Sequence, residues 1–138
     1  MKWMLPACLA LSLSACATNK GDPEILKPSA EAFFQRVRWK DFRGAAELLV
    51  PDRQVAFIKA RLKGDDDRDL FITNYELEDA RLSPDTLTAT VISRINWHRL
   101  PSTQEHTAVI TSTFVWSSGV WLLESQDDGP FEELKPAP

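Results

Sequence analysis

The chain has 138 residues, of which 43% are hydrophobic and 26% are charged, which is the size and composition of one ordinary globular domain. Its formal net charge is −4 and no basic stripe runs along it, so the sequence argues against nucleic acid as a partner. No run of about 18 apolar residues occurs, so no membrane-spanning helix is predicted.

The first sixteen residues contain both cysteines of the chain. Lys2 supplies a positive charge, and the mostly apolar run from Trp3 to Leu13 has the length of the hydrophobic part of a secretory signal. The segment Leu13-Ser14-Ala15-Cys16 then resembles the lipobox of bacterial lipoproteins, in which the signal is cut before a cysteine that receives diacylglycerol and palmitate. The resemblance implies a signal peptide over residues 1–15 and lipidation of Cys16.

Two further observations concern this anchor. The earlier segment Leu5-Pro6-Ala7-Cys8 fits the lipobox poorly, because Pro6 departs from the pattern. Ala17, rather than Asp, follows Cys16, and in the sorting pattern of enteric bacteria this implies the outer membrane, on its periplasmic face. The alternative is an ordinary cleaved signal with an unrelated cysteine at position 16.

Irregular segments are expected at both ends of the mature chain. Residues 16–28 lack amphipathic periodicity and are predicted to form a tether between the lipid and the domain. Residues 127–138 contain Gly129-Pro130 and are predicted to form an irregular tail, in which Phe131 and Leu134 could pin part of the chain to the domain. The domain itself is therefore placed at residues 29–126.

The first third of this domain has helical periodicity. A first helix starts near Pro28-Ser29, Asp41 can cap a second, and a third runs from Pro51 to Gly64. Apolar residues at helical spacing define the expected inner faces. These are Ala30, Phe33, Phe34 and Val37 in the first helix, Phe42, Ala45, Ala46 and Leu49 in the second, and Val55, Ile58 and Leu62 in the third.

From Phe71 the period changes toward two, which is typical of strands. A turn around Pro101-Ser102 pairs residues whose numbers sum to 203, and the apolar positions of residues 86–99 and 104–116 then share one face. A Ser118-Gly119 turn closes the next hairpin. The predicted pairs are Trp97 with His106, Ile95 with Ala108, Ala89 with Phe114, Leu87 with Trp116, Trp116 with Trp121, and Phe114 with Leu123.

The earliest strand changes parity between Leu77 and Ala80, which indicates a β-bulge near Glu78-Asp79. The predicted fold class is α+β, with three N-terminal helices packed on a curved antiparallel meander of about four strands.

Two phrases carry a second resemblance. The segment AFFQRVRWKDFRGAAELL looks like the opening of small domains in the nuclear transport factor two-like superfamily, and FVWSSGVWLLES is similar to their closing hairpin. The resemblance spans roughly residues 28–126. It implies a cone whose sheet wraps a long helix and can leave a pocket. Isomerases, dehydratases and many non-enzymatic lipoproteins share this cone, so the resemblance leaves the function open.

Four residues are candidates for lining such a pocket. His106 is placed on the apolar face opposite Trp97, where it could act as a base or ligand, although a hydrogen-bonded or hydrated histidine at the rim is the favoured interpretation. Tyr75 and Asp79 can face inward on the first strand, and Trp97 could stack on a ligand or fill the core. No phosphate loop, cysteine cluster or serine-nucleophile motif appears, so neither a cofactor nor a catalytic residue is predicted.

An acidic window precedes the first strand. Asp65, Asp67 and Asp69 alternate, and Glu76 closes a twelve-residue stretch that resembles a calcium-binding EF-hand loop. Leu70 occupies the position where such a loop requires glycine, so a solvated acidic loop without metal is the favoured interpretation.

Taken together, the sequence predicts a lipid-anchored, non-catalytic binding or assembly module on the periplasmic face of the outer membrane. Its expected partners are the membrane, an envelope protein or a small apolar ligand. An isomerase- or dehydratase-like enzyme with a cone-shaped pocket and a calcium-dependent structural protein are the alternatives.

Overall fold

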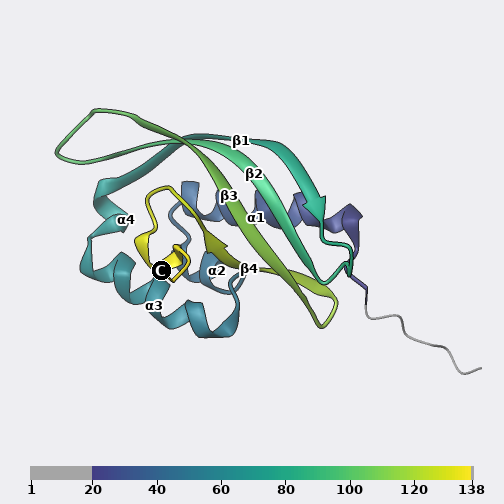
Figure 1. Ribbon diagram of the computed structural model, residues 1–138. Coiled ribbons are helices and arrows are strands. Elements are labelled where there is room, and N and C mark those ends of the chain that lie inside the picture. The colour runs from purple at the N-terminus through teal and green to yellow at the C-terminus, as the bar shows by residue number, and fades with distance from the viewer. Residues whose placement is uncertain (1–19, 138) are drawn as a thin grey trace, which may run out of the picture.

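The computed structural model describes residues 20–137, and the predicted signal peptide and Cys16 lie outside them. The order of elements confirms the α+β class, with helices followed by a four-stranded antiparallel sheet of strand order β1-β2-β3-β4 (Figure 1). The elements are the 3₁₀ helix η1 Pro23–Ile25, helices α1 Leu26–Arg38, α2 Phe42–Ala46, α3 Pro51–Lys63 and α4 Asp66–Asp69, strands β1 Leu70–Leu82, β2 Thr88–Arg99, β3 His106–Ser117 and β4 Val120–Gln126, and the 3₁₀ helix η2 Glu132–Leu134.

The strand registers confirm the two predicted hairpins. Every residue of β2 that pairs with β3 does so at the predicted sum of 203, including Trp97 with His106 and Ala89 with Phe114. Trp116 pairs with Trp121 across the second hairpin. The register follows from the period of two, because a slip by one residue would turn the apolar face toward solvent.

Strand β1 contains the predicted irregularity. Its register against β2 shifts between Leu77 and Asp79, which confirms the bulge expected there, and shifts a second time between Ile72 and Asn74. Each shift leaves one residue of β1 unpaired and increases the local twist. The sheet remains open, with β1 and β4 as its edges.

Helix α1 fills the concave side of the sheet, where it contacts β1, β2 and β4. Phe34 stacks on Tyr75 of β1 with a centroid distance of 5.6 Å, and Phe33 meets Phe57 of α3 and Phe131 edge-on or tilted at about 6 Å. The aromatic side chains that are 2% exposed or less are Phe33, Phe34, Phe57, Phe114, Trp121 and Phe131. These rings fill the interior between the helices and the sheet.

The packed domain extends past both of its predicted bounds. Gly21 is buried against Trp121, and η1 and the first turn of α1 occupy residues that the sequence assigned to a tether. At the other end, Phe131 and Leu134 are fully buried, so much of the predicted irregular tail belongs to the core. Among the described residues, no helix is both long enough and apolar enough to cross a membrane.

Candidate functional site

Helix α3 turns a different face to the core than its apolar spacing predicts. The buried residues of α3 are Phe57 and Arg61, which are four positions apart. The predicted inner residues Val55 and Leu62 are instead 62% and 71% exposed, and Ile58 is half-buried. The sequence prediction is therefore wrong for Val55 and Leu62, whereas Ile58 packs partly against the core as predicted. We call the apolar row of Val55, Ile58 and Leu62 the α3 stripe.

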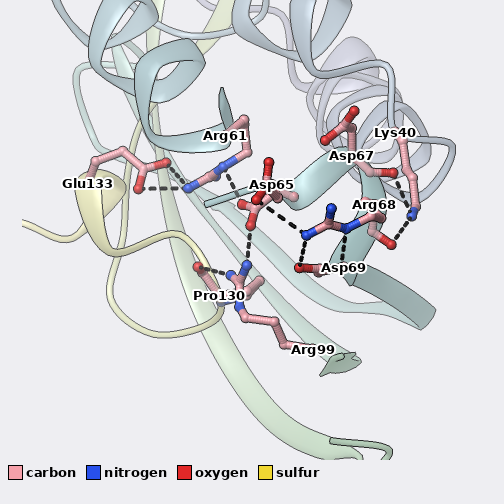
Figure 2. A network of polar contacts seen from close by, with 10 residues as sticks. Lys40, Arg61, Asp65, Asp67, Arg68, Asp69, Arg99, Pro130 and Glu133 are labelled. Carbon is pink, nitrogen blue, oxygen red and sulfur yellow. Dashed lines mark hydrogen bonds and ion pairs between the residues drawn. The ribbon is translucent and has the colours of Figure 1, made fainter. Parts of the chain in front are cut away.

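The orientation of α3 follows from the partners of Arg61. Its Nε lies 2.6 Å from Asp66 Oδ2 and its Nη2 lies 2.8 Å from Glu133 Oε1, so two carboxylates balance the guanidinium, which is only 6% exposed (Figure 2). The guanidinium also lies over the rings of Phe57 and Phe131, which are in contact with each other, at 4.8 and 4.6 Å from their centroids. A buried arginine that is paired in this way can occupy an inner helix face.

Asp66 is the centre of this network. It is 1% exposed and pairs with Arg61 and also with Arg99 of β2, whose Nη2 donates to the carbonyl of Pro130 at 3.4 Å. The network therefore joins α3, α4, β2 and the C-terminal segment. Asp66 was not among the residues predicted to have a role, because the alternating spacing of Asp65, Asp67 and Asp69 favoured its neighbours as calcium ligands. Arg61 and Asp66 stand only five positions apart, and this pair of opposite charges was the available signal.

A hollow lies beside the α3 stripe. It has a volume of about 270 Å³ and is bounded by α3, α4 and the turn between α1 and α2, with Phe42, Ile58 and Leu62 as its apolar lining. Lys40, from that turn, donates to the carbonyl of Asp67 at 2.9 Å and lies 3.7 Å from the ring centroid of Phe71 (Figure 2). These contacts of Lys40 hold the turn between α1 and α2 against α4 and β1, so this wall of the hollow has a fixed position.

The turn that forms one wall is held by Asp41. Its Oδ1 accepts from the N–H of Gly44 at 3.0 Å, which caps α2, and its Oδ2 accepts from Arg36 at 2.8 Å. The N–H of Gly44 and then the Arg36 guanidinium hold the pKa of Asp41 below its ordinary value.

Positive charges flank the stripe. Lys59 and Lys63 follow Val55 at four and eight positions on the exposed side of α3, and Arg43 lies in the wall of the hollow. Within residues 20–137, none of these three cations forms an ion pair. The surface therefore combines exposed aliphatic side chains with these three unpaired cations, and Asp41 and Asp67 also line the hollow.

The four pocket residues predicted from the sequence lie in separate places. Trp97 and His106 are stacked at 5.5 Å beside a shallow hollow of about 250 Å³ that Arg99 and Pro130 also line. Tyr75 is half-buried against α1, and Asp79 is paired with Arg81 at 2.7 Å, which lowers its pKa. The structure therefore brings Trp97 and His106 together and leaves Tyr75 and Asp79 elsewhere on β1.

The acidic window is divided by the fold. Asp65 and Asp69 both pair with Arg68, at 3.3 and 3.0 Å, and Glu76 is exposed within β1. Leu70, which stands where an EF-hand requires glycine, starts β1. Among residues 20–137, no group of three or more His, Cys, Asp and Glu side chains is placed to hold a metal ion.

Neither a protein-family model nor a curated protein matches the sequence. A solved structure with a similar fold is the solution structure of a SEC-C motif containing protein from Rhodopseudomonas palustris. The TM-score is 0.56 at 15% sequence identity, and the likeness covers 70% of this chain and 73% of that one. At this identity the likeness shows a shared small α+β fold, and fold alone does not assign function.

Proposed function

We propose that the protein is a lipid-anchored binding module of the bacterial envelope, attached through Cys16 to the periplasmic face of the outer membrane. The observation that carries the binding role is the α3 stripe. Val55 and Leu62 are exposed next to a hollow lined by Phe42 and Ile58, and such contiguous apolar surface is typical of interaction sites.

The filled interior supports a binding role over catalysis. The sequence resembles the nuclear transport factor two-like superfamily, and enzymes of that superfamily would use the inside of the cone as their active site. Here Phe33, Phe34 and Phe114 fill that space. The apolar groups that a partner could reach at fixed positions lie instead on the surface around α3.

Charge indicates the chemistry of the partner. Lys59, Lys63 and Arg43 surround the stripe, whereas the whole chain has a net charge of −4. A partner with an apolar segment flanked by Asp or Glu would bury Val55 and Leu62 and neutralise these cations. We therefore propose an acidic segment of another envelope protein as the occupant.

The anchor is tested by acylation. The wild-type protein should incorporate labelled palmitate and sediment with the outer membrane, whereas Cys16→Ser should do neither. The matched control is Cys8→Ser, which lies in the predicted signal peptide and should leave labelling unchanged. Palmitate incorporation by Cys16→Ser would contradict the lipoprotein assignment.

The docking surface is tested by site-specific crosslinking in cells. A photo-crosslinking residue at Val55 should give one discrete adduct, and the same residue at Thr90, which is exposed on the other face of the sheet, should not. Reversing charge with Lys59→Glu and Lys63→Glu should reduce the Val55 adduct several-fold. Equal adducts at Val55 and Thr90, or an adduct that charge reversal leaves unchanged, would contradict the proposed surface.

A further inference from the structure

The described chain starts at one end of the sheet. The N–H of Gly21 donates to the carbonyl of Thr86 in the β1–β2 turn at 2.9 Å, and Trp121 Nε1 donates to the carbonyl of Asp22 at 2.7 Å. Figure 1 shows this start beside the β1–β2 and β3–β4 turns, while the β2–β3 hairpin lies at the opposite end. The point at which the chain enters the domain is therefore fixed at the end that carries these two turns.

Only a short stretch of chain separates this point from Cys16. Five Cα–Cα steps join Cys16 to Gly21, and even when fully extended they span at most about 18 Å. Strand β2 has 12 residues, so it spans up to about 37 Å between its first and last Cα atoms. The reach of the tether is therefore about half the length of the sheet.

Exposed aliphatic groups lie at this end of the sheet. Leu87 is the last residue of the β1–β2 turn and Val120 follows the β3–β4 turn, and both side chains are exposed. The β1–β2 turn is joined to the last part of β3, because Trp116 N–H donates to the carbonyl of Leu87 at 2.8 Å. This end of the sheet thus presents two aliphatic side chains on a rigid support.

The charges at this end define the surface that it can meet. Asp85 is exposed in the β1–β2 turn, where the hydroxyl of Ser83 and the N–H of Leu87 bond its carboxylate. Glu24 of η1 is exposed as well, as are the cations Lys20 and Lys27 of the same segment. Because these opposite charges offset one another, intrinsic electrostatic affinity for an anionic membrane is weak. The tether, rather than this affinity, must hold the end at the bilayer.

We propose that the short tether holds the domain end-on, with the β1–β2 and β3–β4 turns against the lipid surface and Leu87 and Val120 in contact with the headgroup region. This rests on the proposed lipidation of Cys16. The orientation also determines where the α3 stripe lies relative to the membrane. Helix α3 is followed by α4, and Asp66 of α4 pairs with Arg99 at the far end of β2. Leu62, near the end of α3, is therefore held away from the membrane and open to an envelope partner.

The test uses the full lipidated protein in phosphatidylcholine vesicles. Cysteine is introduced at Ser118 in the β3–β4 turn, at Thr103 in the β2–β3 hairpin, or at Thr90 on the outer face of the sheet, and is labelled with a fluorophore. All three positions are exposed. Quenching is the ratio of emission in unbrominated and brominated vesicles. We expect several-fold more quenching at Ser118 than at Thr103 or Thr90.

Other orientations predict different results. Quenching that is equal at Ser118 and Thr103 means that the sheet lies flat, and strongest quenching at Thr90 means that its outer face is down. Either result overturns the proposal. Inserting twenty Gly and Ser residues after Thr18 should bring quenching at Ser118 down to the level at Thr103, and quenching that stays unchanged would overturn the role of the tether.

Failure of the anchor itself gives a separate signal. Lipidation blocks the Cys16 thiol, so the protein without an introduced cysteine should not react with maleimide and should float with the vesicles. Reaction at Cys16 together with absence from the vesicles would refute the proposed function. Flotation without reaction, combined with equal quenching at all positions, would refute the end-on orientation alone.

Discussion

The indole Nε1 of Trp121 donates a hydrogen bond to the main-chain carbonyl of Asp22, 99 residues earlier in the chain, at 2.7 Å. The same ring occupies the space where a side chain at Gly21 would lie. This contact fixes where the N-terminal segment joins the domain, at the end of the sheet that carries the β1–β2 and β3–β4 turns.

Replacing Trp121 with phenylalanine tests this contact. Trp121→Phe keeps an aromatic ring but removes the donor, so we expect a loss of about 1–2 kcal/mol in the free energy of unfolding, from the hydrogen bond and the smaller ring. Hydrogen exchange should accelerate at the amides of Gly21 and Glu24. The matched control is Trp39→Phe at an exposed position, which should change stability by less than about 0.5 kcal/mol. Similar losses in both variants would contradict the role of the contact.

The buried charge network predicts a large difference between two adjacent aspartates. Asp66→Asn leaves Arg61 and Arg99 without their shared carboxylate, and removing one partner of a buried ion pair costs about 3 kcal/mol or more. Asp67→Asn changes an exposed side chain and should cost less than about 0.5 kcal/mol. Urea denaturation of the two variants measures both values. Equal small losses would show that Asp66 is not the centre of the network.

The contrast between α3 and the sheet explains how far the sequence determines the fold. The register of β2 against β3, and that of β3 against β4 up to Phe114, could be predicted because an alternating pattern can place its apolar residues on only one of two faces, and the wrong choice would expose Ile95 and Ile110. The register shift between Thr113 and Phe114 was not predicted. In α3, the same kind of pattern favoured the wrong face. Hydropathy counts Arg61 as polar, and its burial depends on Glu133, which lies 72 residues further along the chain.

The domain boundaries depend on interactions of a similar kind. Gly21 and Asp22 join the fold through a main-chain N–H and a carbonyl group. All residues other than proline have both groups, so the amino-acid composition does not reveal such contacts. Phe131 and Leu134 are apolar, so part of the signal for the C-terminal segment was present. The α3 stripe could not be predicted as exposed without knowing which residues cover the other face of the helix.

Calcium should not stabilise the protein specifically. Asp65 and Asp69 share Arg68, and Glu76 lies on β1 opposite Arg94, whose guanidinium pairs with Glu78 instead. Among the described residues, no three of these carboxylates are gathered where they could hold a metal ion. The melting temperature in millimolar calcium chloride should therefore equal that in magnesium chloride at the same ionic strength. A calcium-specific rise that Glu76→Gln abolishes would contradict this and would favour metal binding.

The stability of the protein should depend on pH through Asp41, which holds the turn that bounds the hollow beside the α3 stripe. Because its folded-state pKa is lowered from 3.8, Asp41 contributes stability that is fully present above that value and is lost as the pH falls through the folded pKa. Asp41→Asn keeps an oxygen that can cap α2 but removes the charge that pairs with Arg36. The variant should be less stable than the wild type at pH 7. The difference between their urea midpoints should shrink as the pH falls toward 2, because protonation removes the same charge from the wild type, and a difference that is the same at both pH values would contradict the assignment.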